Sequence, residues 1–135
     1  MKRVLLDGRL WSLAISGAIV AIGLALTPSQ SGFGTHRELG FAPCSVLSAT
    51  GRPCPTCGMT TSVSATLRGD FALAFRAHPL GIALALGSIA AFLMSAWALA
   101  LSRPMPLAPR TRLAILFLFA LSALIYGGIR FFAND

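Results

Sequence analysis

Charged side chains are scarce in this chain of 135 residues, of which Asp, Glu, Lys and Arg together make up 11%. A soluble domain has about 25% of such residues. Hydrophobic residues account for 56% of the chain, which excludes a disordered protein and argues against a soluble globular one. The strand-like alternation of polar and apolar residues is also missing, so a membrane β-barrel is excluded.

Acidic residues are the scarcest charged type, with four Asp and Glu against eleven Lys and Arg and a net charge of +7. In a soluble protein such a basic excess would suggest nucleic acid as a partner. Here the basic residues flank long apolar runs, which is where membrane proteins carry them. We therefore expect the lipid bilayer to be the partner, with no nucleic acid. A membrane-protein partner or a second copy of the chain stays open.

Three apolar runs without any charged residue predict membrane-spanning helices at residues 10–26, 79–101 and 113–129. The two shorter runs fall just below the thickness of the hydrocarbon core. We expect them to extend past Arg9 and Arg130, whose long side chains can reach the interface. The predicted fold class is an all-α integral membrane protein. It forms one membrane domain over residues 1–135, with an amphipathic or re-entrant helical segment at residues 27–77.

Basic residues beside the predicted spans indicate the orientation of the chain. Short cytoplasmic loops of membrane proteins carry an excess of Lys and Arg, whereas long loops count less. The bases lie densely before the first span and between the second and third, and thinly in segment 27–77. We therefore expect the N-terminus inside and segment 27–77 outside the cytoplasm. The bases expected inside are Lys2, Arg3, Arg9, Arg103, Arg110 and Arg112.

Small residues recur every four positions along the second predicted span. A stripe of this kind lets two helices approach closely within a membrane. We expect it to pack against another helix of the same chain rather than against a partner subunit. The stripe consists of Ala83, Gly87, Ala91 and Ser95.

Cysteine is rare, and all three cysteines, Cys44, Cys54 and Cys57, lie in the external segment. A C-x-x-C pair closes easily into a small disulfide ring, and its two sulfurs can equally bind a soft metal ion such as zinc. Three thiolates and one imidazole would complete a tetrahedral zinc site, with His78 or His36 as the possible fourth ligand. The blander interpretation makes His36 a solvated loop residue and His78 the cap of the following helix. The spacing alone does not choose between metal and redox chemistry.

Local signals divide the rest of the external segment into helices. The four-residue apolar spacing that begins at Met59 predicts an amphipathic helix that lies on the outer interface or dips into it. Gly69 is expected to end that helix in a left-handed conformation, and Asp70 to cap a short helix over residues 71–77. Pro79 suits the first turn of the next helix.

The C-x-x-C pair directly precedes the predicted helix after Gly58. Unpaired N–H groups and the positive end of the helix dipole favour a thiolate at Cys57 or Cys54. The nearby Arg52 would add to this effect. We therefore expect one thiol of the pair to have a lowered pKa.

The same segment resembles the bacterial membrane family known as domain of unknown function 2752. That family has a cysteine followed about ten residues later by C-P-x-C-G-x-T-R, then a G-D pair and N-P-L before a membrane-spanning helix. Thr61 stands where the family usually has arginine, and His78 where it often has asparagine. The resemblance implies a small protein of the bacterial cytoplasmic (inner) membrane and supplies no reaction. It rests on Cys44, Thr50-Gly51-Arg52-Pro53-Cys54-Pro55-Thr56-Cys57-Gly58-Met59-Thr60, Leu67-Arg68-Gly69-Asp70, Ala74-Phe75 and His78-Pro79-Leu80.

Three hypotheses for the function follow from the cysteines. The first is a binding or accessory membrane module whose C-x-x-C holds a soft metal, zinc or another, or a structural disulfide. The alternative is a membrane thiol–disulfide oxidoreductase with Cys54 as the attacking thiol and Cys44 as its resolving partner. In the third, a disulfide clips the external segment to the helices. The chain lacks a second C-x-x-C pair and a recognisable quinone or flavin motif, which argues against an enzyme.

Overall fold

The computed structural model describes residues 8–105 and 107–133, and within them the regular secondary structure consists of helices only, joined by turns and loops. Three of these helices, α2, α6 and α7, are long and apolar enough to cross a membrane. The predicted fold class, an all-helical protein with three potential membrane spans, is therefore confirmed. In chain order the elements are α2 (Gly8–Ala25), the 3-10 helix η1 (Thr35–Leu39), α3 (Ser45–Thr50), α4 (Met59–Leu67), α5 (Phe71–Ala77), α6 (Pro79–Ala100) and α7 (Pro109–Ala133).

The ends of the long helices follow from their flanking residues. Pro79 occupies the first turn of α6, where its missing N–H costs nothing, and this helix starts as expected. α7 is longer than the apolar run 113–129, because it continues through Arg112 and Arg130 at its two ends. Arginine is a good helix former whose side chain can extend to the membrane interface, so a charge at the edge of an apolar run does not end the helix.

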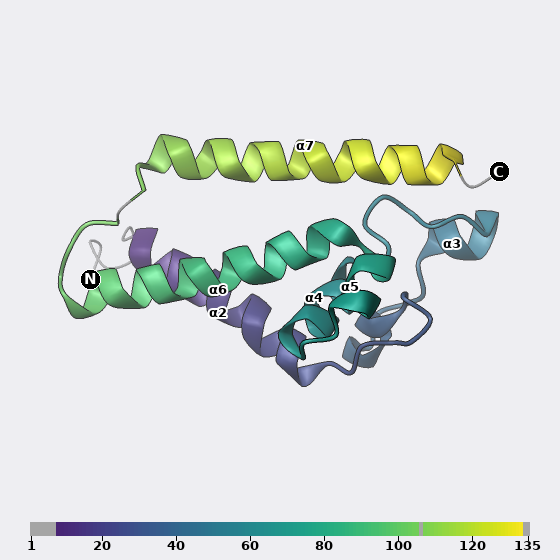
Figure 1. Ribbon diagram of the computed structural model, residues 1–135, viewed down its shortest axis with the longest axis horizontal. Coiled ribbons are helices and arrows are strands. Elements are labelled where there is room, and N and C mark those ends of the chain that lie inside the picture. Colours follow the sequence, from purple (N-terminus) through teal and green to yellow (C-terminus); the bar gives the residue numbers. More distant parts are fainter. Residues whose placement is uncertain (1–7, 106, 134–135) are drawn as a thin grey trace.

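α2 and α6 pack against each other as an antiparallel pair (Figure 1). The Ser95 hydroxyl donates a hydrogen bond to the Ser12 hydroxyl at 2.9 Å. At the end of the pair, Nη1 of Arg9 donates to the carbonyl oxygen of Arg103 at 2.9 Å. Both bonds join residues far apart in the sequence, so they fix the register of the two helices.

The predicted small-residue stripe on α6 has the wrong phase. Ala83 and Gly87 are exposed, and of the four predicted residues only Ser95 is buried. An α-helix has 3.6 residues per turn, so residues spaced strictly by four drift around its surface. The residues of a packing face are instead spaced alternately by three and four positions. The buried residues of α6 are Gly81, Ala85, Ser88, Ser95 and Ala98.

α4 packs against both α2 and α6 at one end of this pair (Figure 1). All six residues from 61 to 66 are buried, so α4 does not bury a single apolar stripe. Of the two predicted placements, a helix lying on the surface is wrong for α4. Its hydroxyl groups are satisfied internally. Ser62 donates to the carbonyl oxygen of His78 at 2.7 Å, and Ser64 donates to the carbonyl oxygen of Leu26. Because these polar groups are paired, their burial carries little penalty.

The turn between α4 and α5 forms as the sequence predicts. Gly69 has a φ of +83°, and the side chain of Asp70 accepts a hydrogen bond from the backbone N–H of Leu73 at 2.9 Å. α5 then covers residues 71–77 and leads through the extended residue His78 directly into α6. This tight path places α5 beside α4 and closes the end of the bundle.

α7 runs alongside the α2–α6 pair and ends near the segment that carries α3 (Figure 1). Most of its large apolar side chains are exposed, and its two buried residues, Ala123 and Gly127, both lie in its second half. Its contact with the rest of the chain is therefore concentrated at the end that holds the cysteines.

Candidate functional site

The three cysteines predicted as site residues come together in the structure. The sulfur atoms of Cys44, Cys54 and Cys57 all lie within 4.8 Å of one another. Those of Cys54 and Cys57 are 2.8 Å apart, and all three residues are free cysteines. Cys57 is buried, whereas the other two are half-buried. The group thus has one sulfur in the protein interior and two that face partly outward.

A short helix brings Cys44 back to the C-x-x-C pair. α3 begins directly after Cys44, whose carbonyl oxygen accepts the first helical hydrogen bond, from Ser48 at 2.9 Å. The helix ends at Gly51, and the chain then turns toward Cys54. A second turn, closed by the hydrogen bond from Cys57 N to Cys54 O at 3.0 Å, holds the two residues of the pair close together.

His78 supports the C-x-x-C turn from the inside. Its side chain is fully buried, and its Nε2 lies 3.1 Å from the carbonyl oxygen of Pro55. Because a carbonyl oxygen only accepts, Nε2 carries the proton, and Nδ1 is buried without a hydrogen-bond partner among the residues that the structure describes. Burial lowers the pKa of His78 and so favours the neutral ring. The imidazole packs edge-on against Tyr126 of α7, with 5.0 Å between the ring centroids.

α7 holds the same turn from the other side. A Cβ atom on Gly127 would lie 2.2 Å from Cα of Pro55, so only glycine permits this approach of helix and turn. Nη1 of Arg130 donates to the carbonyl oxygen of Ala77 at 2.8 Å and lies 3.4 Å from that of Cys57. The C-x-x-C turn is therefore held between the start of α6 and the end of α7.

Sequence reasoning did not identify Tyr126 and Arg130 as part of the site. A signal was present, because a tyrosine and an arginine four positions apart share one face of a helix. In an otherwise apolar membrane span, such a pair indicates the face of the helix that contacts polar groups of the protein. Its partner, however, could not be read from the sequence.

His36 was interpreted as a solvated loop residue, but it lies beside the cysteines. It lines a cavity of about 250 Å³ together with Cys44 and Cys57. Among the described residues, the set of potential metal-binding atoms within 4.8 Å of one another contains the three sulfurs and neither histidine. The remaining residues around the cavity are Ser31, Phe33, Gly34, Arg37, Pro43, Leu47 and Gly58.

The thiols differ in acidity, though not in the expected way. A hydrogen bond from the backbone of Leu47, in the first turn of α3, is the main cause that lowers the pKa of Cys44 to about 7. Burial, followed by the hydrogen bond with Cys54, raises the pKa of Cys57 to about 12. A thiolate was predicted at Cys57 or Cys54, and the Cys57 alternative is therefore wrong, because loss of water outweighs the dipole of the following helix. The thiol with a lowered pKa is Cys44.

We expect alkylation of the reduced, metal-free protein to reflect this order. A thiol reacts as the thiolate, which forms as the pH rises through its pKa. Labelling of Cys44 by iodoacetamide should reach half its maximal rate near pH 7, while Cys57 stays almost unlabelled across the neutral range. Mass spectrometry of the labelled peptides measures both profiles. Equal profiles for the two cysteines would contradict the assignment.

Residues 44–97 match the model of the family described as Protein of unknown function (DUF2752). The resemblance recognised in the sequence is thereby confirmed, and the matched segment contains all three cysteines. No curated protein and no solved structure matches the chain. At the position where the family usually has arginine, Thr61 is buried and its hydroxyl lies 2.8 Å from that of Thr35. This hydrogen bond connects α4 to η1.

Proposed function

We propose that this protein is a membrane module that binds a soft metal ion through Cys44, Cys54 and Cys57. The observation that carries the proposal is the convergence of three sulfurs within 4.8 Å, one of them from the far side of α3. Two cysteines are enough for a disulfide, whereas a third sulfur adds a ligand. Zinc and copper(I) are the metals that favour thiolate ligands.

The surroundings of the sulfurs support this proposal. Metal sites depend on outer groups that orient the ligands, and Pro55 and Cys57 are held by such groups through their backbones. Nε2 of His78 lies 3.1 Å from the carbonyl oxygen of Pro55, and Nη1 of Arg130 lies 3.4 Å from that of Cys57. We propose His36 as the fourth ligand of a zinc ion, since it faces the cavity that Cys44 and Cys57 line.

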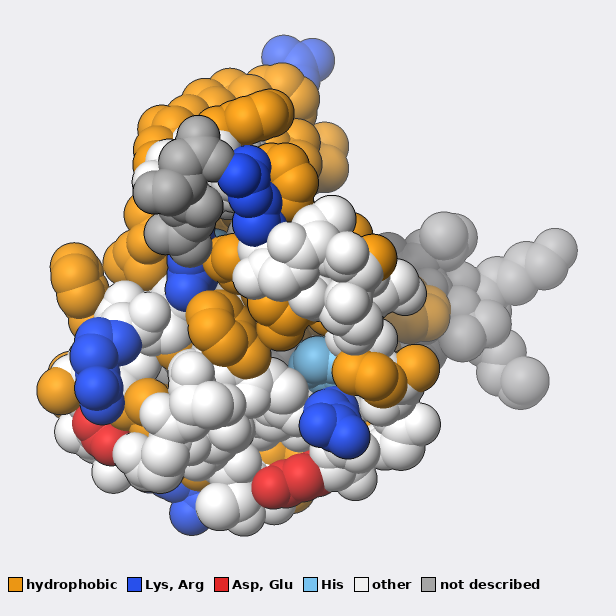
Figure 2. All heavy atoms as spheres, turned by 90° about the vertical axis from the view of Figure 1, so that its right-hand side faces the viewer, with side chains coloured by type: hydrophobic (Ala, Val, Ile, Leu, Met, Phe, Trp, Pro, Cys, Tyr) orange, Lys and Arg blue, Asp and Glu red, His pale blue; other side chains and the backbone are white. Residues whose placement is uncertain are grey.

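We further propose that the cysteine end lies outside the cytoplasm, in a bacterial cytoplasmic membrane. Both acidic residues that the structure describes, Glu38 and Asp70, belong to segment 27–77. Figure 2 shows this end of the molecule, where acidic and basic side chains are mixed. The opposite end has arginines alone among its described charged residues, as the cytoplasmic side usually does. The exposed rings of Phe71 and Phe75 on α5 would contact lipid at the outer interface.

The test traps the three thiols in native membranes by rapid alkylation, with and without prior treatment by a chelator. We expect the cysteines to be protected at first and to become labelled after chelation, and metal analysis of the purified protein should find bound metal. Metal-free protein whose cysteines are all alkylated at once would contradict the proposal. So would a Cys54–Cys57 bridge that only a reductant opens.

Thiol–disulfide exchange is the second candidate, favoured by the 2.8 Å between the sulfurs of Cys54 and Cys57. In this reaction the two thiols would form a disulfide and pass two electrons and two protons to a partner disulfide, which becomes two thiols. The reductant arm of the trapping experiment tells this candidate from the metal site.

A further inference from the structure

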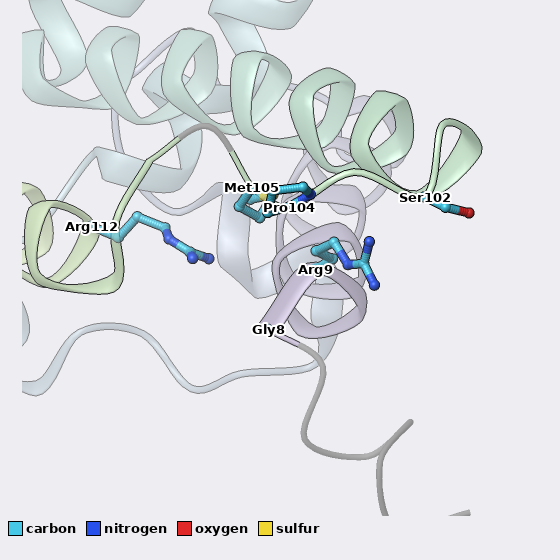
Figure 3. A pocket seen from close by; sticks show the side chains of 6 residues that line it. All are labelled: Gly8, Arg9, Ser102, Pro104, Met105 and Arg112. Atoms are coloured by element: carbon cyan, nitrogen blue, oxygen red, sulfur yellow. The ribbon is translucent and has the colours of Figure 1, made fainter.

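The end of the molecule opposite the cysteines contains a second cavity, of about 410 Å³. Three segments meet there: the start of α2, the connection after α6 and the start of α7 (Figure 3). The side chains of Arg9 and Arg112 give this cavity a basic lining. The six lining residues are Gly8, Arg9, Ser102, Pro104, Met105 and Arg112.

The side chain of Arg112 indicates which kind of ligand the cavity binds. In Figure 3 its side chain extends from α7 toward Pro104 and Met105. The Nε atom of Arg112 is buried and has no hydrogen-bond partner within the described part of the chain. An arginine does not lose its charge in a protein, so a buried guanidinium N–H requires an acceptor. The described acidic residues, Glu38 and Asp70, lie in the segment at the other end.

The opposite wall of the cavity is fixed by Arg9. Its Nη1 donates to the carbonyl oxygen of Arg103 at 2.9 Å, which ties the start of α2 to the connection after α6. Arg103 directly precedes Pro104 in the sequence and adds positive charge. The local excess of positive charge, together with the unpartnered Nε atom, favours an anion with several oxygen acceptors.

We propose that this cavity binds the phosphate group of an anionic phospholipid. Arginine side chains match phosphate oxygens in geometry and charge, and basic pockets between membrane helices bind lipid headgroups. The cavity lies at the ends of three potential spans, at the depth where headgroups are found. Directly beyond it, Leu113, Leu116 and Phe117 of α7 are exposed and offer an apolar surface for the acyl chains.

The test uses the purified full-length protein in phosphatidylcholine nanodiscs, with native mass spectrometry to count added lipids. We expect phosphatidylglycerol to remain bound to the protein in preference to phosphatidylcholine. Arg112→Gln should weaken this binding by about tenfold, the worth of a charge-assisted hydrogen bond. Inorganic phosphate is added as a competitor, because free phosphate has the same chemistry. Competition by phosphate as effective as that by phosphatidylglycerol would assign the cavity to the free anion and overturn the lipid proposal.

Arg110→Gln is the matched control, since it removes the same charge from an exposed residue that does not line the cavity. It should leave the binding within about twofold of wild type, because an exposed charge is screened. Equal losses in both variants would contradict a specific site. If Arg112→Gln does not fold, Arg112→Lys replaces it, and unchanged binding in that variant contradicts a role for the guanidinium.

Asp7 precedes Gly8 in the sequence, lies outside the described residues and carries a carboxylate, which accepts hydrogen bonds. Asp7→Asn therefore tests for an internal ion pair. We expect this variant to bind phosphatidylglycerol at least as well as the wild type. If only the variant prefers phosphatidylglycerol over phosphatidylcholine, then the acceptor belongs to the chain and the proposal fails.

Discussion

Cys57→Ser is expected to lower the affinity of the protein for Zn²⁺, Cd²⁺ or Cu⁺ by more than about a hundredfold, since even outer-shell partners of metal ligands are worth 10- to 100-fold. Cys57 is the buried member of the group, only 8% exposed, and its sulfur is 2.8 Å from that of Cys54. A serine hydroxyl has similar shape but is a neutral, hard ligand, which soft metals bind poorly. Metal titration monitored by the charge-transfer absorption between sulfur and Cd²⁺ measures the effect.

The control is Thr60→Ala, which removes a half-buried hydroxyl group three residues after Cys57 and leaves all three sulfurs and their hydrogen bonds. We expect its metal affinity to stay close to that of the wild type. Cys44→Ser separates the two main hypotheses: in a three-thiolate site it should cost about as much as Cys57→Ser. In a Cys54–Cys57 disulfide clip it should change nothing, because the bridge remains. Full metal affinity in Cys44→Ser would therefore contradict the proposed site.

Local signals were enough to predict several elements of the fold. Gly69 and Asp70 stop one helix and cap the next, and Pro79 starts α6, so the boundaries of α5 and α6 follow from adjacent residues. The burial of α4 could not be predicted in this way. It depends on hydrogen bonds from Ser62 to His78 and from Ser64 to Leu26, whose partners are 16 and 38 positions away. The spacing of apolar residues carries no information on hydroxyl groups that donate hydrogen bonds to carbonyl oxygens of other segments.

In the candidate site, too, local features could be predicted from the sequence, whereas contacts between distant residues could not. The nearness of Cys54 and Cys57 follows from their spacing, since two intervening residues allow a single turn. That Cys44 joins them depends on α3 and on the turn that follows it. The contact of Arg130 with Cys57 joins residues 73 positions apart, and nothing near either residue indicates it. The pKa order of the thiols likewise depends on burial, which is a property of the packed structure.

Gly58→Ala is expected to lower the free energy of unfolding by about 3 kcal/mol or more, from a strained backbone and from overpacking. Gly58 has a φ of +89°, in the left-handed region that disfavours a side chain. A Cβ atom there would lie 2.5 Å from the carbonyl oxygen of Ala77 and 2.9 Å from that of Gly32. Both obstacles are backbone atoms, so they cannot rotate away. Denaturant unfolding in detergent micelles measures the loss of stability.

Gly69→Ala isolates the part of this effect that comes from the clash. Gly69 has nearly the same φ, +83°, but a Cβ atom there would meet nothing within 4 Å. Its variant should therefore lose only about 1 to 2 kcal/mol, the cost of the left-handed backbone. Because Gly58 directly follows Cys57, only its variant should also weaken metal binding. Equal destabilisation in the two variants would mean that Ala77 and Gly32 yield, and that the C-x-x-C turn is not held rigidly against the start of α6.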